Sequence, residues 1–271
     1  MSAPIIPGAE PISITGSQGG VLLLHGYTAT PQQMRGWAMA FAQAGFAVEV
    51  PLLPGHGTVP DDLVDTQWAD YLHCADTAYR RLAEHHQRVF VGGLCMGANL
   101  AGWMALLHPK TTAGVFVING TFKSPRGGKP EIWEKLLKSG RKFFSWPTTP
   151  IFVNDPQAPA LVSYDKIPIG PGFSVVEAYA QLRQRLGEIS CPVLVLTSQH
   201  EWQEAPEDSI PWLQETAGPA QHIILERSNH VATLDYDKDI IETRSVEFAF
   251  AIIDGKLEQS RKEVSLASQE L

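Results

Sequence analysis

The sequence predicts an α/β fold in which a mostly parallel central sheet carries helices on both faces. Short apolar runs that are typical of buried strands recur along the chain, and helix-length amphipathic segments separate them. Several runs are apolar at successive positions, as expected for strands covered on both sides. The 271 residues, 44% hydrophobic and 18% charged, suffice for one such domain with an inserted segment and exclude a chain that is disordered throughout.

The first half of the chain alternates predicted strands with predicted helices. The first apolar run ends at Gly26, and the helix that follows opens at Pro31 and ends at Gly45, in agreement with the usual positions of these residues at helix ends. The predicted strands are residues 20–26, 46–53, 88–94 and 113–118, and the predicted helices are residues 31–45, 68–86 and 96–108.

The alternation breaks between residues 119 and 171 and then resumes. The later predicted helices are residues 175–186, 210–216 and 237–253, and the later predicted strands are residues 192–196 and 221–225. We therefore expect a core made of residues 1–118 and 172–254, a small cap or lid insertion at residues 119–171, and a polar C-terminal tail at residues 255–271.

Composition limits the partners and the compartment. The net charge of −8 argues against a nucleic-acid-binding surface. Three cysteines are too few for a disulfide framework in a chain of this length, which favours a reducing, cytoplasmic compartment. No Lys or Arg precedes Arg35, so no secretory signal is expected, and no apolar run approaches the roughly 18 residues of a membrane span.

Residues 93–97, Gly-Leu-Cys-Met-Gly, join a predicted strand directly to a predicted helix. In this context a nucleophile between two glycines sits on a strained turn, and its side chain points out of the sheet. The helix N-terminus behind Cys95 favours the thiolate, so we predict that Cys95 is a nucleophile. The alternative is that Cys95 is an ordinary buried cysteine.

Four segments make the chain resemble the α/β-hydrolase fold family, and within it the bacterial carboxylesterases and monoacylglycerol lipases. They are His25–Thr28, Pro54–Gly57, Gly93–Gly97 and Ser228–Asp235, and the resemblance extends from about Val21 to Ile253. It implies an α/β-hydrolase fold and a lipase-like carboxylesterase activity without a cofactor. The family usually carries serine at the position of Cys95, although its dienelactone hydrolases and polyhydroxyalkanoate synthases use cysteine. The sequence leaves open whether this cysteine is native or replaces a serine.

The same resemblance implies the partners of Cys95. His230 follows the last predicted strand, where the family keeps its catalytic histidine, and the order nucleophile, acid, histidine is that of these hydrolases. The family's acid lies nine residues after the proline at position 192, which is Glu201 here. Three acids in the same loop compete with it, namely Glu204, Glu207 and Asp208. The alternatives are a structural or surface histidine and solvated loop carboxylates.

Acyl transfer also requires donors for the developing oxyanion. The backbone N–H of Met96, directly after the nucleophile, would supply one, and the backbone N–H of Tyr27, after His25 and Gly26, would supply the other. The alternative for Tyr27 is an aromatic side chain at the rim of the site.

The inserted segment is basic and amphipathic. Residues 121–145 carry a net charge of +5, which leaves −13 for the rest of the chain. The apolar residues Ile132, Trp133, Leu136, Leu137, Phe143 and Phe144 are expected mostly on one helical stripe, with the bases opposite. The segment is interpreted as an ordinary cap helix, as an attractor of anionic substrates, or as a transient contact with a membrane or lipid surface. Trp133, Leu137 and Phe144 are the predicted substrate-binding residues.

Cys74 and Cys191 lack neighbouring ligands in the sequence, so we predict no metal site, and the chain has no phosphate or dinucleotide loop.

The predicted function is hydrolysis of a small carboxylic ester or thioester with an apolar acyl or leaving group, through a Cys95–His230–Glu201 triad and an acyl-enzyme. The alternatives are an acyltransferase that uses the same acyl-enzyme, a lyase or carbon–carbon bond hydrolase, and a non-catalytic ligand-binding protein on this scaffold. The oligomeric state stays open.

Overall fold

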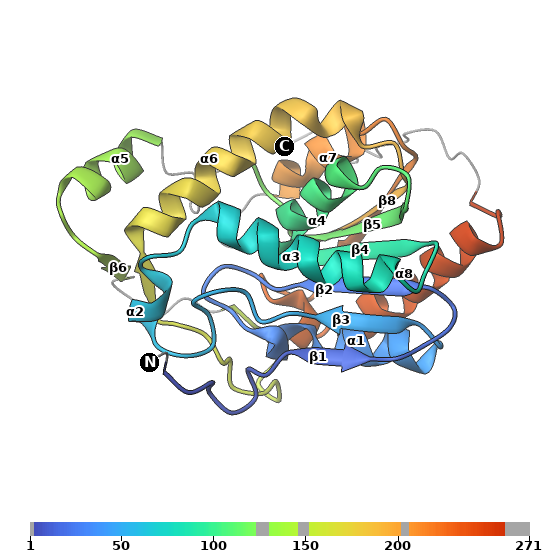
Figure 1. The fold of residues 1–271 in the computed structure, drawn as a ribbon, viewed down its shortest axis with the longest axis horizontal. Helices are drawn as coiled ribbons and strands as arrows, with labels where there is room; N and C mark the ends of the chain where they lie inside the picture. The colour runs from blue at the N-terminus through green and yellow to red at the C-terminus, as the bar shows by residue number, and fades with distance from the viewer. Residues whose placement is uncertain (1–2, 123–129, 146–151, 202–205, 258–271) are drawn as a thin grey trace.

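The fold is a seven-stranded sheet with helices on both faces (Figure 1). The computed structural model describes residues 3–122, 130–145, 152–201 and 206–257. The strand order is β1-β3-β2-β4-β5-β8-β9; β1 is antiparallel to β3, and all other neighbours are parallel. The strands are β1 (Ile12–Ile14), β2 (Gly20–Leu24), β3 (Ala47–Val50), β4 (Val89–Leu94), β5 (Thr112–Ile118), β8 (Val193–Ser198) and β9 (Ala220–Leu225). The predicted mostly parallel α/β fold is therefore confirmed.

Helices cover the sheet in two layers. Helices α3, α4, α6 and α7 pack on one face, and α1 and α8 pack on the other (Figure 1). The α-helices are α1 (Arg35–Gln43), α2 (Pro60–Leu63), α3 (Trp68–Ala83), α4 (Met96–Leu107), α5 (Pro130–Lys138), α6 (Ile169–Arg185), α7 (Ile210–Gln214) and α8 (Lys238–Ile253). The short 3-10 helices are η1 (Pro31–Met34), η3 (Leu186–Glu188), η4 (Pro206–Ser209) and η5 (Ala232–Leu234).

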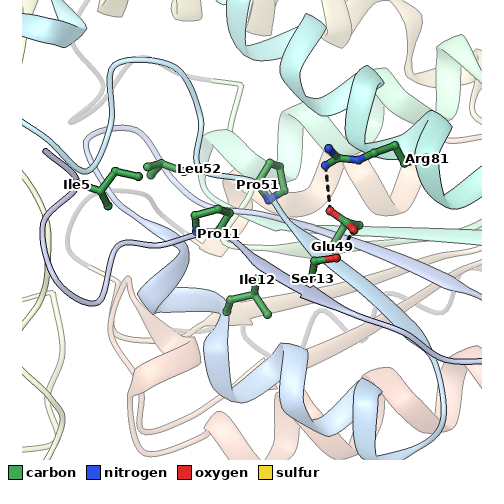
Figure 2. Close-up of a pocket in the computed structure, with 8 residues that line it drawn as sticks. All are labelled: Ile5, Pro11, Ile12, Ser13, Glu49, Pro51, Leu52 and Arg81. Atoms are coloured by element: carbon green, nitrogen blue, oxygen red, sulfur yellow. Dashed lines mark hydrogen bonds and ion pairs between the residues drawn. The ribbon is translucent and has the colours of Figure 1, made fainter. Parts of the chain in front are cut away.

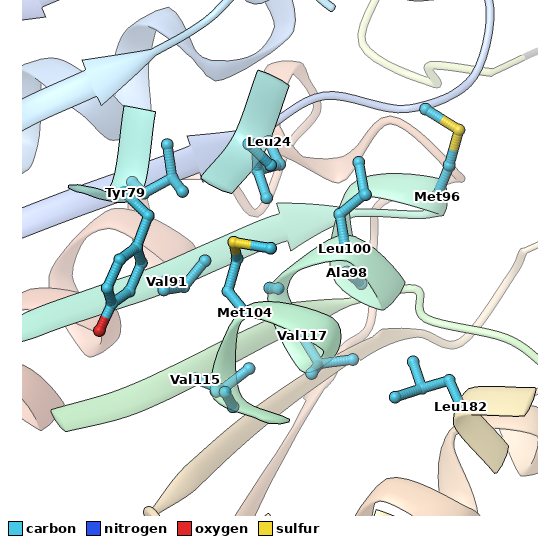
Figure 3. Close-up of a cluster of buried hydrophobic side chains, with 14 of the residues drawn as sticks. Leu24, Tyr79, Val91, Met96, Ala98, Leu100, Met104, Val115, Val117 and Leu182 are labelled. Carbon is cyan, nitrogen blue, oxygen red and sulfur yellow. The ribbon is translucent and has the colours of Figure 1, made fainter. Parts of the chain in front are cut away.

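The central strands are apolar on both faces because each face has its own core. In β5, Val115 and Val117 belong to the cluster under α3, α4 and α6, whereas Phe116 and Ile118 belong to the cluster under α1 and α8. Figure 3 shows part of the first cluster, in which Met104 of α4 lies among side chains of the sheet. This alternation has the period of two that a strand imposes.

Several element ends differ from those predicted. The predicted strand at residues 46–53 is shorter as β3, and β1 was not predicted because it is a three-residue edge strand. Helix α6 begins at Ile169 rather than at residue 175. Pro171 and Gly172 lie in its first turn, where proline removes no hydrogen bond of the helix.

The described part of residues 119–171, the predicted insertion, contains α5 and a two-stranded antiparallel sheet of β6 (Phe143–Ser145) and β7 (Lys166–Pro168). Placing Phe143 and Phe144 on the helical stripe was therefore wrong. Gly140, with φ of +71°, follows the end of α5, and the two aromatic residues after it form β6, in line with the preference of aromatic side chains for strands.

The second half of the insertion is hydrogen-bonded to loops at the carboxyl ends of the parallel strands. The Tyr164 N–H donates to the carbonyl oxygen of Thr28 at 2.9 Å, and the Tyr27 hydroxyl donates to the carbonyl oxygen of Pro168 at 3.0 Å. The insertion therefore lies beside the edge of the sheet that carries the predicted site.

Candidate active site

Cys95 lies at the sharp turn between β4 and α4, with φ of 55° and ψ of −117°. A positive φ is rare for a residue with a side chain and recurs at strained functional positions. Two glycines make the turn compact: a Cβ atom on Gly93 would lie 2.0 Å from the carbonyl carbon of Gly97, and one on Gly97 would lie 1.9 Å from the carbonyl oxygen of Leu24. The turn leaves the Cys95 side chain half-buried at the carboxyl end of β4.

His230 and Glu201 come from the ends of two neighbouring strands. β8 ends three residues before Glu201, and β9 ends five residues before His230. Nδ1 of His230 lies 2.8 Å from Oε1 and 2.7 Å from Oε2 of Glu201, and the two side chains are 8% and 2% exposed. Since the carboxylate accepts the Nδ1 proton, the neutral ring carries its lone pair on Nε2, the nitrogen that can take a proton from a nucleophile.

The surroundings of His230 favour its protonated form. Burial by itself lowers the pKa of His230, but the charges of Glu201 and Cys95 and the hydrogen bonds to both hold this pKa well above its usual value. Cys95 and Glu201 are therefore polar neighbours of the imidazole. The structure brings the predicted nucleophile, base and acid together: His230 is hydrogen-bonded to Glu201, and Cys95 lies close enough to the imidazole to raise its pKa.

The loop that carries His230 is ordered by a buried carboxylate. Asp235, which is fully buried, accepts hydrogen bonds at 2.8 Å from the backbone N–H groups of Asn229 and Asn154. The Asn229 side chain in turn accepts the backbone N–H of His230 at 2.8 Å. The backbone of the loop is thus fixed on both sides of the imidazole, which reduces the freedom of the ring.

The loop after β2 is pre-arranged by a buried neutral histidine. Nε2 of His25 accepts the Leu53 N–H at 3.1 Å, so Nδ1 carries the proton and donates it to the Gly26 carbonyl at 2.9 Å. Burial lowers the pKa of His25 most, and the charge of the nearby His56 lowers it further, to about 3. The ring of His25 therefore stays neutral. Because a trans peptide points its C=O and N–H in opposite directions, the Tyr27 N–H is directed away from His25.

The two predicted oxyanion donors flank the nucleophile. A Cβ atom on Gly26, the residue before Tyr27, would lie 3.6 Å from Cβ of Cys95. Met96 is the first residue of α4, so its N–H has no acceptor within the helix. The positions of Tyr27 and Met96 are therefore compatible with N–H groups that serve one developing negative charge.

Two of the other acids in the 201–208 loop are described by the structure. Glu207 is exposed and Asp208 is buried within η4, and Glu204 falls outside the described residues. Glu201 is the acid of this loop for which a bond to His230 is observed.

A second histidine–carboxylate pair lies at the opposite end of the sheet. Nε2 of His108 is 2.6 Å from Oδ1 of Asp76, and the imidazole stacks on Tyr79 with ring centroids 4.2 Å apart. The Tyr79 hydroxyl is 2.9 Å from Oγ1 of Thr112, the first residue of β5, so this pair belongs to the amino end of the strand. It offers a structural counterpart against which the role of His230 can be measured.

The structure gives only the exposure of two of the three predicted substrate-binding residues. Leu137 on α5 is 46% exposed, Phe144 is half-buried in β6, and the side chain of Trp133 lies outside the described residues. Sequence reasoning missed Phe152, whose ring centroid lies 6.1 Å from that of His230 and whose carbonyl oxygen accepts the N–H of residue 231 at 2.9 Å. Its only signal in the sequence was an aromatic residue in the insertion.

A surface pocket of about 620 Å³ lies away from these residues (Figure 2). It is lined by the N-terminal segment, β1, β3 and α3, and its charged residues pair with each other: Arg81 binds Glu49 at 3.0 Å, and Ser13 donates to the same carboxylate at 2.6 Å. It shares no lining residue with the site around Cys95.

Within the described ranges, no three His, Cys, Asp or Glu side chains are arranged to hold a metal ion. Across those same ranges, each helix is too short or too polar to cross a bilayer. Lys135 and Lys138 on α5 are exposed, and the three interpretations of the basic segment stay predictions.

Comparison with known proteins points in one direction. Residues 21–243 match the model of the Alpha/beta hydrolase family. Over 253 residues the chain is 33% identical to the thermostable monoacylglycerol lipase of Bacillus sp. (strain H-257), covering 90% of this chain and 96% of that protein. It is 22% identical to the carboxylesterase of Bacillus subtilis (strain 168), covering 88% of this chain and 95% of that protein.

Solved structures give the same result. A solved structure reported under LipS and LipT, two metagenome-derived lipolytic enzymes, superposes on this chain with a TM-score of 0.84 at 30% identity. The match covers 91% of this chain and 99% of the chain in that structure. The Paleococcus ferrophilus monoacylglycerol lipase has a TM-score of 0.75 at 20% identity over 89% of this chain and 98% of its own, which supports the fold alone.

Proposed function

The chain belongs to the alpha/beta hydrolase family, and from this premise we propose that it cleaves carboxylic esters or thioesters with Cys95 as nucleophile, His230 as base and Glu201 as orienting acid. Its similarity to lipases and carboxylesterases makes it a lipase-like ester hydrolase. The observation that supports this assignment of residues is the buried His230–Glu201 pair, with Nδ1 2.7 Å from Oε2, next to Cys95 on the strained turn after β4.

The proposed first half of the reaction forms an acyl-enzyme. Nε2 of His230 takes the thiol proton of Cys95, and the sulfur attacks the ester carbonyl carbon. The carbonyl oxygen becomes an oxyanion that the N–H groups of Tyr27 and Met96 stabilise. As the tetrahedral intermediate collapses, the bond to the leaving oxygen or sulfur breaks and the imidazolium donates its proton to that atom. The product is a thioester on Cys95.

The second half restores the free enzyme. His230 takes a proton from water, the resulting hydroxide attacks the thioester, and the carboxylic acid leaves as the sulfur of Cys95 recovers the proton. Glu201 stays ionised throughout, because its part is to hold the Nδ1 proton and stabilise the imidazolium.

We further propose an apolar acyl or leaving group. The ring of Phe152 lies close to His230, and Val153 and Leu161 of the same segment pack against the apolar cluster on the α1 and α8 face of the sheet. A series of p-nitrophenyl esters from acetate to laurate tests this point: kcat/KM should rise with acyl length from acetate, and a steady decrease with length would contradict it.

Thiol alkylation should select Cys95 over the other cysteines. Burial raises the pKa of Cys74 and raises that of Cys191 to about 12, and three pKa units above an ordinary thiol correspond to roughly a thousandfold less thiolate at neutral pH. Cys95 lies instead beside a histidine that can take its proton. Timed iodoacetamide labelling followed by peptide mass spectrometry should find Cys95 labelled first.

The control for this labelling is H230A. That variant should slow the labelling of Cys95 and leave the rates at Cys74 and Cys191 unchanged. Equal labelling of the three thiols in the wild type would count against an activated Cys95 and would favour a binding protein on the hydrolase scaffold.

In E201Q the alkaline limb of the pH–activity profile should shift to lower pH. The imidazolium must protonate an alkoxide leaving group, so turnover falls as the pH rises through the pKa of His230. Since the Glu201 charge raises this pKa, its removal lowers it, and the fall should begin at least about one pH unit lower.

This shift is measured with an ethyl ester by titration of the released acid. The same variants assayed with a p-nitrophenyl ester provide the control, since that leaving group departs without a proton and should show a smaller shift. An alkaline limb that is identical in wild type and E201Q with the ethyl ester would remove Glu201 from the proposal.

A further inference from the structure

Asn119 is a buried asparagine directly after β5, with φ of +46° and 2% exposure. Asparagine adopts this left-handed conformation more readily than most residues with a side chain. The carbonyl oxygen of the preceding residue, Ile118, accepts the backbone N–H of Cys95 at 3.0 Å. The end of β5 is therefore bonded to the turn that carries the nucleophile.

The carboxamide of Asn119 binds the other two segments of the site. Its Oδ1 accepts the Ser198 N–H at 2.8 Å, and its Nδ2 donates to Ser198 Oγ at 3.0 Å and to the carbonyl oxygen of His230 at 2.9 Å. A carbonyl can only accept, so the contact with His230 fixes which end of the amide is the nitrogen. Ser198 Oγ passes the connection on to the carbonyl oxygen of Asn229 at 2.9 Å.

These bonds link the three segments that bring together the nucleophile, the base and the acid. Ser198 ends β8, three residues before Glu201, and the carbonyl of His230 belongs to the base itself. We propose that Asn119 is a positioning residue that holds the Glu201 loop and the His230 backbone in register with Cys95. This rests on the proposed function for its consequence in catalysis, but the geometry of the His230–Glu201 pair can be tested without any turnover.

Loss of the carboxamide cannot be compensated locally. Ser198 is fully buried, so its N–H would lose its acceptor away from water, and its Oγ would keep only the bond to the Asn229 carbonyl oxygen. The strand ends would then shift until the N–H found another partner. A movement of about 1 Å between Nδ1 of His230 and the Glu201 carboxylate is enough to weaken a charge-assisted hydrogen bond and to misplace Nε2.

The test uses two substitutions that leave the charge of the protein unchanged, and a matched control. N119G removes the carboxamide and relieves the positive φ, whereas S198A removes only the hydroxyl that Asn119 and Asn229 share. Y79F is the control, because the Tyr79 hydroxyl bonds Thr112 at the other end of the same strand. Each variant is checked for folding by circular dichroism and thermal melting.

The first readout is the pKa of the His230 ring, followed by NMR in protein with isotope-labelled histidine and assigned by comparison with H230A. Among the described residues of the wild type, the charged or titratable groups that act on the ring are Glu201 and Cys95, and the neutral ring of Phe152 lies beside it. N119G should lower this pKa by at least about one unit, in the direction expected for a weakened carboxylate contact. S198A should lower it less, and Y79F should leave it unchanged while lowering the melting temperature.

The second readout is the division between kcat and KM. N119G should lower kcat by about 10-fold to 100-fold with KM within twofold, since the reacting groups and not the binding surface are displaced. Folded N119G with a wild-type His230 pKa and kcat would overturn the proposal, and if N119G does not fold, S198A with both values unchanged would do so. If the wild type hydrolyses no ester, the proposed function fails, and the His230 titration alone decides the role of Asn119.

Discussion

Replacement of Cys95 by alanine is expected to lower kcat/KM for p-nitrophenyl butyrate by about 10⁴-fold to 10⁶-fold. The variant keeps the oxyanion donors and the base but has no atom to form the acyl-enzyme. A spectrophotometric assay measures the loss, and the melting temperature should stay close to that of the wild type, because the removed sulfur is only half-buried.

The matched controls are C74A and C191A, which should keep their activity because these thiols lie outside the proposed site. C95S keeps a nucleophile on the same turn and should retain more activity than C95A. If C95A kept a tenth or more of the wild-type activity, the nucleophile would have to be another group.

Replacement of His230 by alanine is expected to lower kcat/KM by about 10²-fold to 10⁴-fold, the usual contribution of a positioned general base. Added imidazole should restore part of the activity, because a small base can enter the space that the ring leaves.

H108A is the comparison that separates catalysis from structure. His108 also pairs with a carboxylate, at 2.6 Å from Asp76, but at the amino end of β5. H108A should lower the melting temperature and leave kcat/KM within twofold. Equal losses of activity in H230A and H108A would mean that the effect of His230 is structural.

The central strands β2, β4, β5 and β8 could be predicted because they are apolar on both faces. Runs such as residues 113–118 carry their signal in a few consecutive residues. Short elements lack this signal: β1 has three residues at the sheet edge, and Phe143 and Phe144 fit a helical stripe in the sequence although they form β6. Local pattern could not decide between helix and strand there, because the pairing partner, β7, lies more than twenty residues away.

The family resemblance, together with the predicted strands, implied where each residue of the candidate site lies. Cys95, Glu201 and His230 follow the ends of β4, β8 and β9 by one, three and five residues, at the edge where parallel strands present their carboxyl ends. Asn119 also follows a strand, but its bonds reach Ser198 and His230, which are 79 and 111 residues away in the sequence. A single asparagine gives no sign of such contacts before the fold is known.

The most direct test of the account is the mass of the enzyme during turnover. Wild-type protein mixed with p-nitrophenyl acetate to laurate, quenched in acid within seconds and examined by intact-mass and peptide spectrometry, should carry one acyl group on the peptide that contains Cys95. The adduct should be absent from C95A and should accumulate less in H230A. An acyl group on another residue, or turnover by C95A at the wild-type rate, would contradict the assignment of Cys95.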